Sequence, residues 1–170
     1  RYRRGREGAQ KSAVSGVAAG RHARSAGRTG PTRLGVVRAV LIVNPNATST
    51  TAAGLALLAH ALESRVQLAV ERTDHRGHAI EIAQQSARDG VDVVIVHGGD
   101  GTVNEVVNGL LGSPGGAGPA NVQRRVPAVA VVPGGSANVF ARSLGIPHDP
   151  IDATNLLIDQ LAHRQLRRNV

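Results

Sequence analysis

Three short runs of consecutive apolar residues constrain the fold of this 170-residue chain more than any other feature. They are Ala39–Val43, Val93–Val96 and Ala128–Val132, and each is soon followed by the Asn, Gly or Pro residues that are typical of turns. A strand that is apolar at every position, rather than at alternate positions, is typical of a parallel sheet covered on both faces. Residues 66–72 form a weaker strand candidate.

Helical patterns lie between these runs, because apolar side chains recur there at spacings of three and four residues. Asp149 followed by Pro150 also predicts the start of a helix, with an N-cap and then proline at the first position. Strands that alternate with helices predict βαβ units with right-handed crossovers. We therefore expect an α/β fold, a three-layer sandwich with a mainly parallel sheet. The helical stripes comprise Leu55/Leu58/Leu62, Ala79/Ile82/Ala83, Val103/Val106/Val107/Leu110/Leu111, Ala137/Phe140/Ala141/Leu144 and Ala153/Leu156/Leu157/Leu161.

The excess of positive over negative charge is confined to the first 38 residues of the chain. Residues 1–38 carry ten basic side chains and one acidic side chain, whereas residues 39–170 have a net charge of −1. This Arg- and Gly-rich segment has too few large apolar side chains to offset the entropy of ordering, so we expect a disordered tail before one domain at 39–170. It could grip nucleic acid or anionic lipid, but charge alone carries no specificity. A solvated leader is the favoured interpretation, and no specific nucleic-acid partner is expected.

The composition excludes several classes of function. The chain has no Cys, which rules out disulfides, zinc–thiolate clusters and a thiol nucleophile. One Tyr and one Phe leave little aromatic surface on which nucleic-acid bases could stack. No run of 18 or more apolar residues is present, so no membrane-spanning helix is predicted. Residues 113–125 have no helical or strand period and are predicted to form a flexible surface loop.

Three polar turns follow the predicted strands, at 44–48, 98–104 and 134–138. Ligands of open parallel sheets bind beyond the carboxyl ends of the strands, so we expect these turns to share one ligand site. The middle turn has three glycines in four residues, directly before a predicted helix. Exposed backbone amides and a helix N-terminus together predict a phosphate cradle.

Asp100 lies inside that turn, and its carboxylate would repel a bound phosphate unless it has a role of its own. It could hold Mg²⁺, cap the helix that follows or bond a nucleotide hydroxyl. Glycine-rich turns also serve tight strand-to-helix packing with no ligand at all, and one such turn alone would leave the two interpretations equal. The presence of the other two polar turns favours a ligand site.

The segment GGDGTVNEVVNGL at 98–110 resembles the nucleotide-binding motif of the diacylglycerol kinase catalytic domain, a family that includes sphingosine kinases and bacterial lipid kinases. Two more segments match in order, VNP at 43–45 and VPGGSANVFAR at 132–142. The resemblance covers about residues 39–162. It implies an ATP-dependent lipid kinase that transfers a phosphoryl group to the hydroxyl of a diacylglycerol-like or sphingoid lipid, with Mg²⁺ as the metal. It also implies a cytoplasmic enzyme that contacts the membrane surface transiently.

The resemblance also implies the site residues. Ser136 stands where the family usually has Thr, so the hydroxyl is kept. Thr73 matches a nucleotide-contacting Thr of bacterial members. The residues implied to bind ATP are Asn44, Thr73, Gly98, Gly99, Asp100, Gly101, Thr102, Val103, Asn104, Gly135 and Ser136.

Two departures from the family pattern stand out. Val139 replaces the Asp that is common after Asn138, which removes one carboxylate. The family's second, mostly β domain, which completes the lipid pocket and carries the general base, has no counterpart here. We therefore expect a fragment that holds the nucleotide half of a lipid kinase, with no catalytic base of its own and Asp100 in a supporting role. An apolar seam left without that domain would favour aggregation or a homodimer.

Two alternatives remain at this stage. A NAD kinase-like enzyme would share the GGDGT turn, but it predicts an NTDNE-type segment later, where this chain has GGSAN at 134–138. A non-catalytic nucleotide-binding fragment is the other. His75 and His78 are three residues apart, but without an acidic or Cys partner they are interpreted as a surface pair and no metal site is predicted. Arg142 could reach a phosphate, although a solvated helix face explains it equally.

Overall fold

The computed structural model of the chain describes residues 36–112 and 126–163. The predictions of a disordered tail and of a flexible loop at 113–125 therefore lie outside it, apart from residues 36–38. The first strand, β1 (Val37–Val43), begins two residues before the apolar run that predicted it. Arg38 takes part in the sheet, where it pairs with Gln67, and its amide donates a 3.0 Å hydrogen bond to the Asp92 carboxylate.

The described residues form a four-stranded sheet in the order β2-β1-β3-β4. β2 spans Val66–Arg72, β3 spans Val93–Gly98 and β4 spans Ala128–Pro133. Every neighbouring pair in this sheet is parallel, so all four strands end at the same edge. The α/β fold with a parallel sheet is thus confirmed, including the weaker strand candidate at 66–72.

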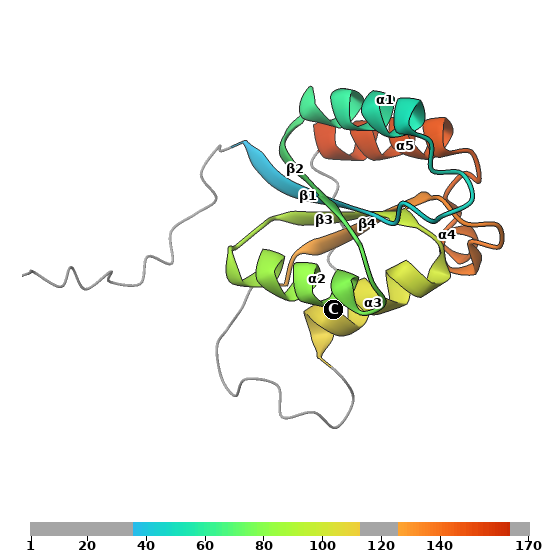
Figure 1. Ribbon diagram of the computed structural model, residues 1–170. Helices are drawn as coiled ribbons and strands as arrows, with labels where there is room; N and C mark the ends of the chain where they lie inside the picture. Colours follow the sequence, from blue (N-terminus) through green and yellow to red (C-terminus); the bar gives the residue numbers. More distant parts are fainter. Residues whose placement is uncertain (1–35, 113–125, 164–170) are drawn as a thin grey trace, which may run out of the picture. The chain divides into compact units, whose positions relative to one another are not determined.

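Helices cover both faces of the sheet (Figure 1). α1 (Ala52–Glu63) and α5 (Pro150–Ala162) lie on one face, and α2 (His78–Arg88) and α3 (Asp100–Leu111) lie on the other. The predicted cap of α5 is present, because the Asp149 carboxylate accepts hydrogen bonds from two amides of the first turn. This layering gives the three-layer sandwich that the alternating pattern predicted.

The continuous apolar runs are explained by the two helix layers. Leu41 in β1 is fully buried in the cluster that includes Leu62 of α1 and Leu157 of α5. Ile42, the next residue, is also fully buried but belongs to the cluster that includes Val106 of α3. Successive strand residues point to opposite faces, so both faces of β1 must be apolar. Each such side chain contributes about 1.5–3 kcal/mol when it is fully removed from water.

The predicted stripe at 137–144 is the exception. α4 spans only Val139–Ser143, and Ala141 is its one buried residue. Phe140 and Leu144 are 40% and 57% exposed, so they do not form a core-facing stripe. A helix of five residues makes barely more than one turn, which is too short to present a continuous apolar face.

The strand order places a switch point between β1 and β3. From β1 the chain passes to β2 on one side, and from β3 it passes to β4 on the other. The loops that leave β1 and β3 therefore separate in opposite directions, and the crevice between them is where open α/β sheets bind their ligands. Within residues 36–112 and 126–163, no helix has both the length and the apolar character needed to cross a bilayer.

Candidate functional site

The glycine turns after β3 and β4 pack backbone against backbone. The amide of Gly134 donates a 2.9 Å hydrogen bond to the carbonyl oxygen of Gly98. A Cβ atom on Gly135 would lie only 2.7 Å from the Cα of Gly99, and one on Gly134 would lie 3.0 Å from the Gly98 nitrogen. Side chains at 134 or 135 would therefore push the two turns apart.

The remaining glycines of the middle turn differ in what surrounds them. A Cβ on Gly98 would come within 2.8 Å of the Thr102 hydroxyl oxygen, so Gly98 lacks a side chain for reasons of packing. A Cβ on Gly99 would make an ordinary contact, 3.5 Å from the Cα of Gly135. A Cβ on Gly101 would meet nothing within 4 Å. Both the packing role and the open surface that the glycine pattern could indicate are therefore present in this one turn.

The turn after β1 is tied to the other two. Ser49 donates to the Gly134 carbonyl oxygen from its amide at 3.0 Å and from its hydroxyl at 2.8 Å. The Asn44 side chain donates to the Thr102 hydroxyl at 3.2 Å and accepts from the Asn46 amide at 2.9 Å. The three predicted turns therefore meet at one edge of the sheet.

Asp100 holds the third turn in place. Its carboxylate accepts hydrogen bonds from the amides of Phe140 at 2.9 Å and Val139 at 3.0 Å. These bonds, with that from Phe140 first, hold the pKa of Asp100 below its ordinary value. The sequence left open that Asp100 caps the helix that follows it, and this is wrong. Gly99 is the N-cap residue of α3, and Asp100 instead caps α4, across the site.

His97, near the end of β3, lies beneath the turns and links β4 to the segment after β1. It is buried, with 3% of its surface exposed. Its Nδ1 lies 3.2 Å from the Val132 carbonyl oxygen, which can only accept, so Nδ1 carries the hydrogen. Its Nε2 lies 3.2 Å from the Thr50 hydroxyl. Burial lowers the pKa of His97, because a charged ring would be poorly solvated here.

Two adjoining hollows open at this edge. One, of about 300 Å³, lies by the ends of β1 and β2 and the start of α3. The other, of about 290 Å³, lies among the turns after β1, β3 and β4. Asn44, Asn46, Gly101 and Thr102 line both. The predicted residues that line one hollow are Thr73 in the first, and Gly99, Asp100, Gly135 and Ser136 in the second.

Three predicted site residues do not line either hollow. Gly98 is buried at the end of β3. Val103 is 4% exposed and belongs to the core cluster under α3. Asn104 is exposed and accepts a long, 3.4 Å hydrogen bond from the side chain of Asn108, one turn further along α3. Consecutive residues of a helix point in different directions, so a continuous motif cannot place every member in one cavity.

Some lining residues were not predicted. Glu105 lies four residues after Gly101 in α3 and shares its face, a spacing that could have identified it. Asn138 adopts the left-handed conformation, with φ of 47°. Its side chain accepts from the Gly135 amide at 3.0 Å and donates to the Gly135 carbonyl oxygen at 2.6 Å. Asn is one of the few residues with a side chain that tolerates this conformation, which makes it the signal for the turn.

The model of the diacylglycerol kinase catalytic domain matches residues 38–166. The chain belongs to this family. Among curated relatives, it is similar to the diacylglycerol kinase of Bacillus subtilis (strain 168), with 39% identity over 118 residues, which is 67% of this chain and 35% of that protein. It is also similar to the diacylglycerol kinase of Staphylococcus aureus (strain JH9), with 37% identity over 87 residues, or 51% of this chain and 24% of that protein.

A solved structure supports the same assignment. The crystal structure of a diacylglycerol kinase from Bacillus anthracis str. Sterne superposes with a TM-score of 0.62 at 33% identity, covering 75% of this chain and 44% of that one. The chain therefore spans less than half the length of the diacylglycerol kinases that it matches. The resemblance drawn from the three turns is confirmed, and these turns lie together at the switch point of the family fold.

Proposed function

We propose that this chain is the ATP-binding part of a lipid kinase, which transfers a phosphoryl group from ATP to the hydroxyl of a diacylglycerol-like or sphingoid lipid. The observation that carries the proposal is the pair of hollows at the β1/β3 switch point, which share Asn44, Asn46, Gly101 and Thr102. Phosphoryl transfer depends mainly on positioning and on neutralising charge, and backbone amides at a helix start do both.

The α3 terminus is the part that we assign to the phosphates. The first amides of a helix have no partner within it, and they carry the positive end of the helix dipole. In α3 these amides belong to Asp100 and Gly101, and Gly101 faces both hollows without a side chain. Thr102 and Asn44 hold the turns on either side at a fixed distance through their 3.2 Å hydrogen bond. We assign Thr73 and Ser136 to the outer walls.

Asp100 fits poorly as the ligand of a magnesium ion. Each of its carboxylate oxygens already accepts a backbone hydrogen bond from α4. Magnesium bound to a nucleotide usually keeps several water ligands and takes the others from phosphate and one or two carboxylates. We therefore propose that Mg²⁺ enters with the nucleotide, and we assign Asp100 the role of positioning the turn at 134–138.

The lipid acceptor and the general base are assigned to a part of the kinase beyond residues 36–163. The related diacylglycerol kinases are about two to four times as long as their matched segments, so they have room for such a part. A lipid acceptor also requires the enzyme to work at a membrane surface. We therefore propose peripheral membrane contact by the complete kinase.

Equilibrium binding of a fluorescent ATP analogue, with and without Mg²⁺, tests the proposal on the full chain. Gly101→Leu puts a side chain into the shared wall of both hollows, where an added Cβ meets nothing. It should weaken binding at least tenfold while leaving the unfolding midpoint unchanged. Ala56→Leu, at an exposed position of α1, is the matched control and should bind like the parent chain.

Two results would overturn the proposal. One is the absence of saturable binding by the parent chain. The other is equal affinity in the parent and in Gly101→Leu, because a ligand at this switch point cannot avoid that wall. GTP and inorganic triphosphate serve as competitors. Displacement by triphosphate alone would support the assignment of α3 to the phosphates.

A further inference from the structure

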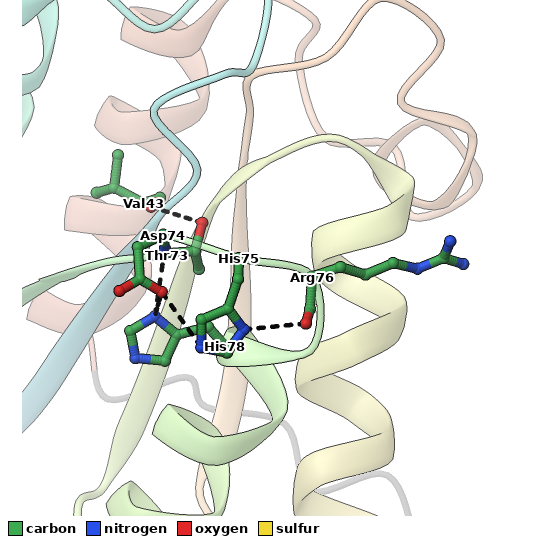
Figure 2. A network of polar contacts seen from close by, with 6 residues as sticks. All are labelled: Val43, Thr73, Asp74, His75, Arg76 and His78. Atoms are coloured by element: carbon green, nitrogen blue, oxygen red, sulfur yellow. Dashed lines mark hydrogen bonds and ion pairs between the residues drawn. The ribbon is translucent and has the colours of Figure 1, made fainter.

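A cluster of possible metal ligands lies in the turn between β2 and α2, where Asp74 and His75 line the outer side of the first hollow. Its members are Asp74, His75 and His78, and their donor atoms all lie within 4.8 Å of one another. Figure 2 shows the two imidazole rings beside the Asp74 carboxylate. The rings are stacked, with centroids 4.7 Å apart. The sequence analysis found no acidic partner for this histidine pair, but in the structure Asp74 lies beside both rings.

The hydrogen bonds around the cluster decide where its protons lie. The Nδ1 atom of His75 is 3.0 Å from the carbonyl oxygen of Arg76, which can only accept, so Nδ1 carries the hydrogen. In the neutral ring, Nε2 then offers a lone pair. That Nε2 lies 3.3 Å from Oδ1 of Asp74, which offers another. Two lone pairs at this distance repel each other unless a cation lies between them.

His78 repeats the conflict from the other side. Its Nδ1 accepts a 3.2 Å hydrogen bond from the amide of Asp74. The same Nδ1 lies 2.7 Å from Oδ1 of Asp74. An Nδ1 atom that accepts from the amide has no hydrogen of its own to offer the carboxylate. Two ring nitrogens and one carboxylate oxygen are therefore gathered within 4.8 Å, and a proton or a metal ion shared among them would relieve their repulsion.

We propose that Asp74, His75 and His78 form a binding site for a divalent transition-metal ion such as Zn²⁺. Two imidazoles and one carboxylate are the ligand types that Zn²⁺ takes, with a fourth position left for water. The Arg76 carbonyl oxygen acts on His75 as the outer partner that usually orients a ligating histidine, because it fixes the tautomer and leaves Nε2 open.

The distances suit such an ion after a small adjustment. Bonds of about 2.0–2.1 Å in a tetrahedral site separate the ligand atoms by about 3.3 Å. The gap between Asp74 Oδ1 and His75 Nε2 already has this length, at 3.3 Å, whereas that between Asp74 Oδ1 and His78 Nδ1 must widen from 2.7 Å. The His75 side chain is 54% exposed, so its ring has room to turn toward a shared ion. The carboxylates of Glu81 and Glu105 lie near enough to His75 to favour positive charge there.

The proton is the competing occupant of this site. A metal must therefore displace a proton, so its apparent affinity should fall as the pH is lowered. The proposed ligands all come from the β2–α2 turn, but Asp74 and His75 also line the first hollow, so the metal titration is made without nucleotide.

Calorimetric titration of the full chain with ZnCl₂ at pH 7.5 is the test. We expect one saturable site, weakened at least tenfold in His75→Ala and in Asp74→Asn. His60→Ala removes an exposed histidine of α1 and is the matched control, with unchanged affinity. Far-ultraviolet circular dichroism of each variant shows whether the fold is kept.

A second measurement uses the unmodified chain. Paramagnetic Co²⁺ should broaden the NMR ring signals of His75 and His78 before those of the buried His97. The proposal is overturned if Zn²⁺ binds His75→Ala as tightly as the parent chain. It is also overturned if Co²⁺ leaves both ring signals sharp while a pH titration shifts them, since the cluster would then hold only a proton.

Discussion

Two strand-to-helix turns at the same sheet edge are built on opposite principles. The turn from β3 to α3, at 98–101, is mostly main chain, and Gly134 and Gly135 pack against it at distances that leave them no room for a Cβ. The turn from β2 to α2, at 73–77, is covered with exposed side chains, among them Asp74 and His75. The first turn joins three strand ends and is part of the fold's stability, whereas the second can change its side chains with little structural cost.

Gly135→Ala should produce the largest loss of stability. The new Cβ would lie 2.7 Å from the Cα of Gly99, and neither backbone can move without breaking the hydrogen bond between Gly134 and Gly98. Overpacking of this kind costs about 3 kcal/mol. Urea denaturation followed by circular dichroism measures it. Gly99→Ala, on the other side of the same contact, places its Cβ at an ordinary 3.5 Å and should cost far less. Equal losses would disprove the backbone packing.

His97→Gln should come next, at about 2 kcal/mol, because it removes a buried ring that joins Val132 to Thr50. It should also change the pH dependence. The pKa of His97 is lowered by burial, so below the ordinary value of about 6.5 the unfolded chain binds a proton that the folded chain does not. Stability of the parent chain should therefore be full above pH 6.5 and fall between that pH and the lower, folded pKa.

The variant tests this assignment directly. Its free energy of unfolding, measured from pH 7.5 to pH 5, should fall less steeply than that of the parent. His60→Ala, at the exposed position in α1, should keep the parent's slope. If the free energy of unfolding of His97→Gln depends on pH as steeply as that of the parent, a group other than His97 causes the pH dependence.

Asp100→Asn should cost about 1 kcal/mol, the typical value for the loss of a helix cap. An amide can accept from only one of the two α4 amides that the carboxylate now serves. The pKa of Asp100 is lowered by these bonds, so its stabilisation is full above the ordinary value and lost as the pH falls through the lower, folded value. Below pH 4.5, the parent chain should therefore lose a larger share of its neutral-pH free energy of unfolding than Asp100→Asn does. Acid unfolding followed by circular dichroism measures this. Asp159→Asn, in α5, is the control.

His75→Ala should have the smallest effect on the fold. Its side chain is more than half exposed, and it contacts the Asp74 carboxylate, the Arg76 backbone and the stacked ring of His78. The melting temperature should match that of the parent chain, while Zn²⁺ binding is weakened at least tenfold. A large drop in the melting temperature would show that the β2–α2 turn also contributes to the fold, and the contrast between the two turns would then fail.

The apolar runs were sufficient to predict the sheet, because residues such as Leu41 and Ile42 need a helix layer on each face. The motif was sufficient to predict the location of the site at the strand ends. It failed for individual side chains. Val103 faces the core and Asp100 reaches across to α4, since a helix turns each successive residue by about 100°. The stripe at 137–144 failed because α4 ends after five residues.

The amino-acid sequence by itself determined the layered α/β fold, the strand ends that carry the site and the family to which the chain belongs. These follow from local periodicity and from consecutive residues, which are visible without coordinates. Only the tertiary structure decided which glycines are packed and which one is open, which helix Asp100 caps, and that Asp74 completes a cluster with two histidines. Each of those features depends on atoms that the folded turns bring within a few ångströms of one another. Packing sets such distances, and the order of the residues does not reveal them.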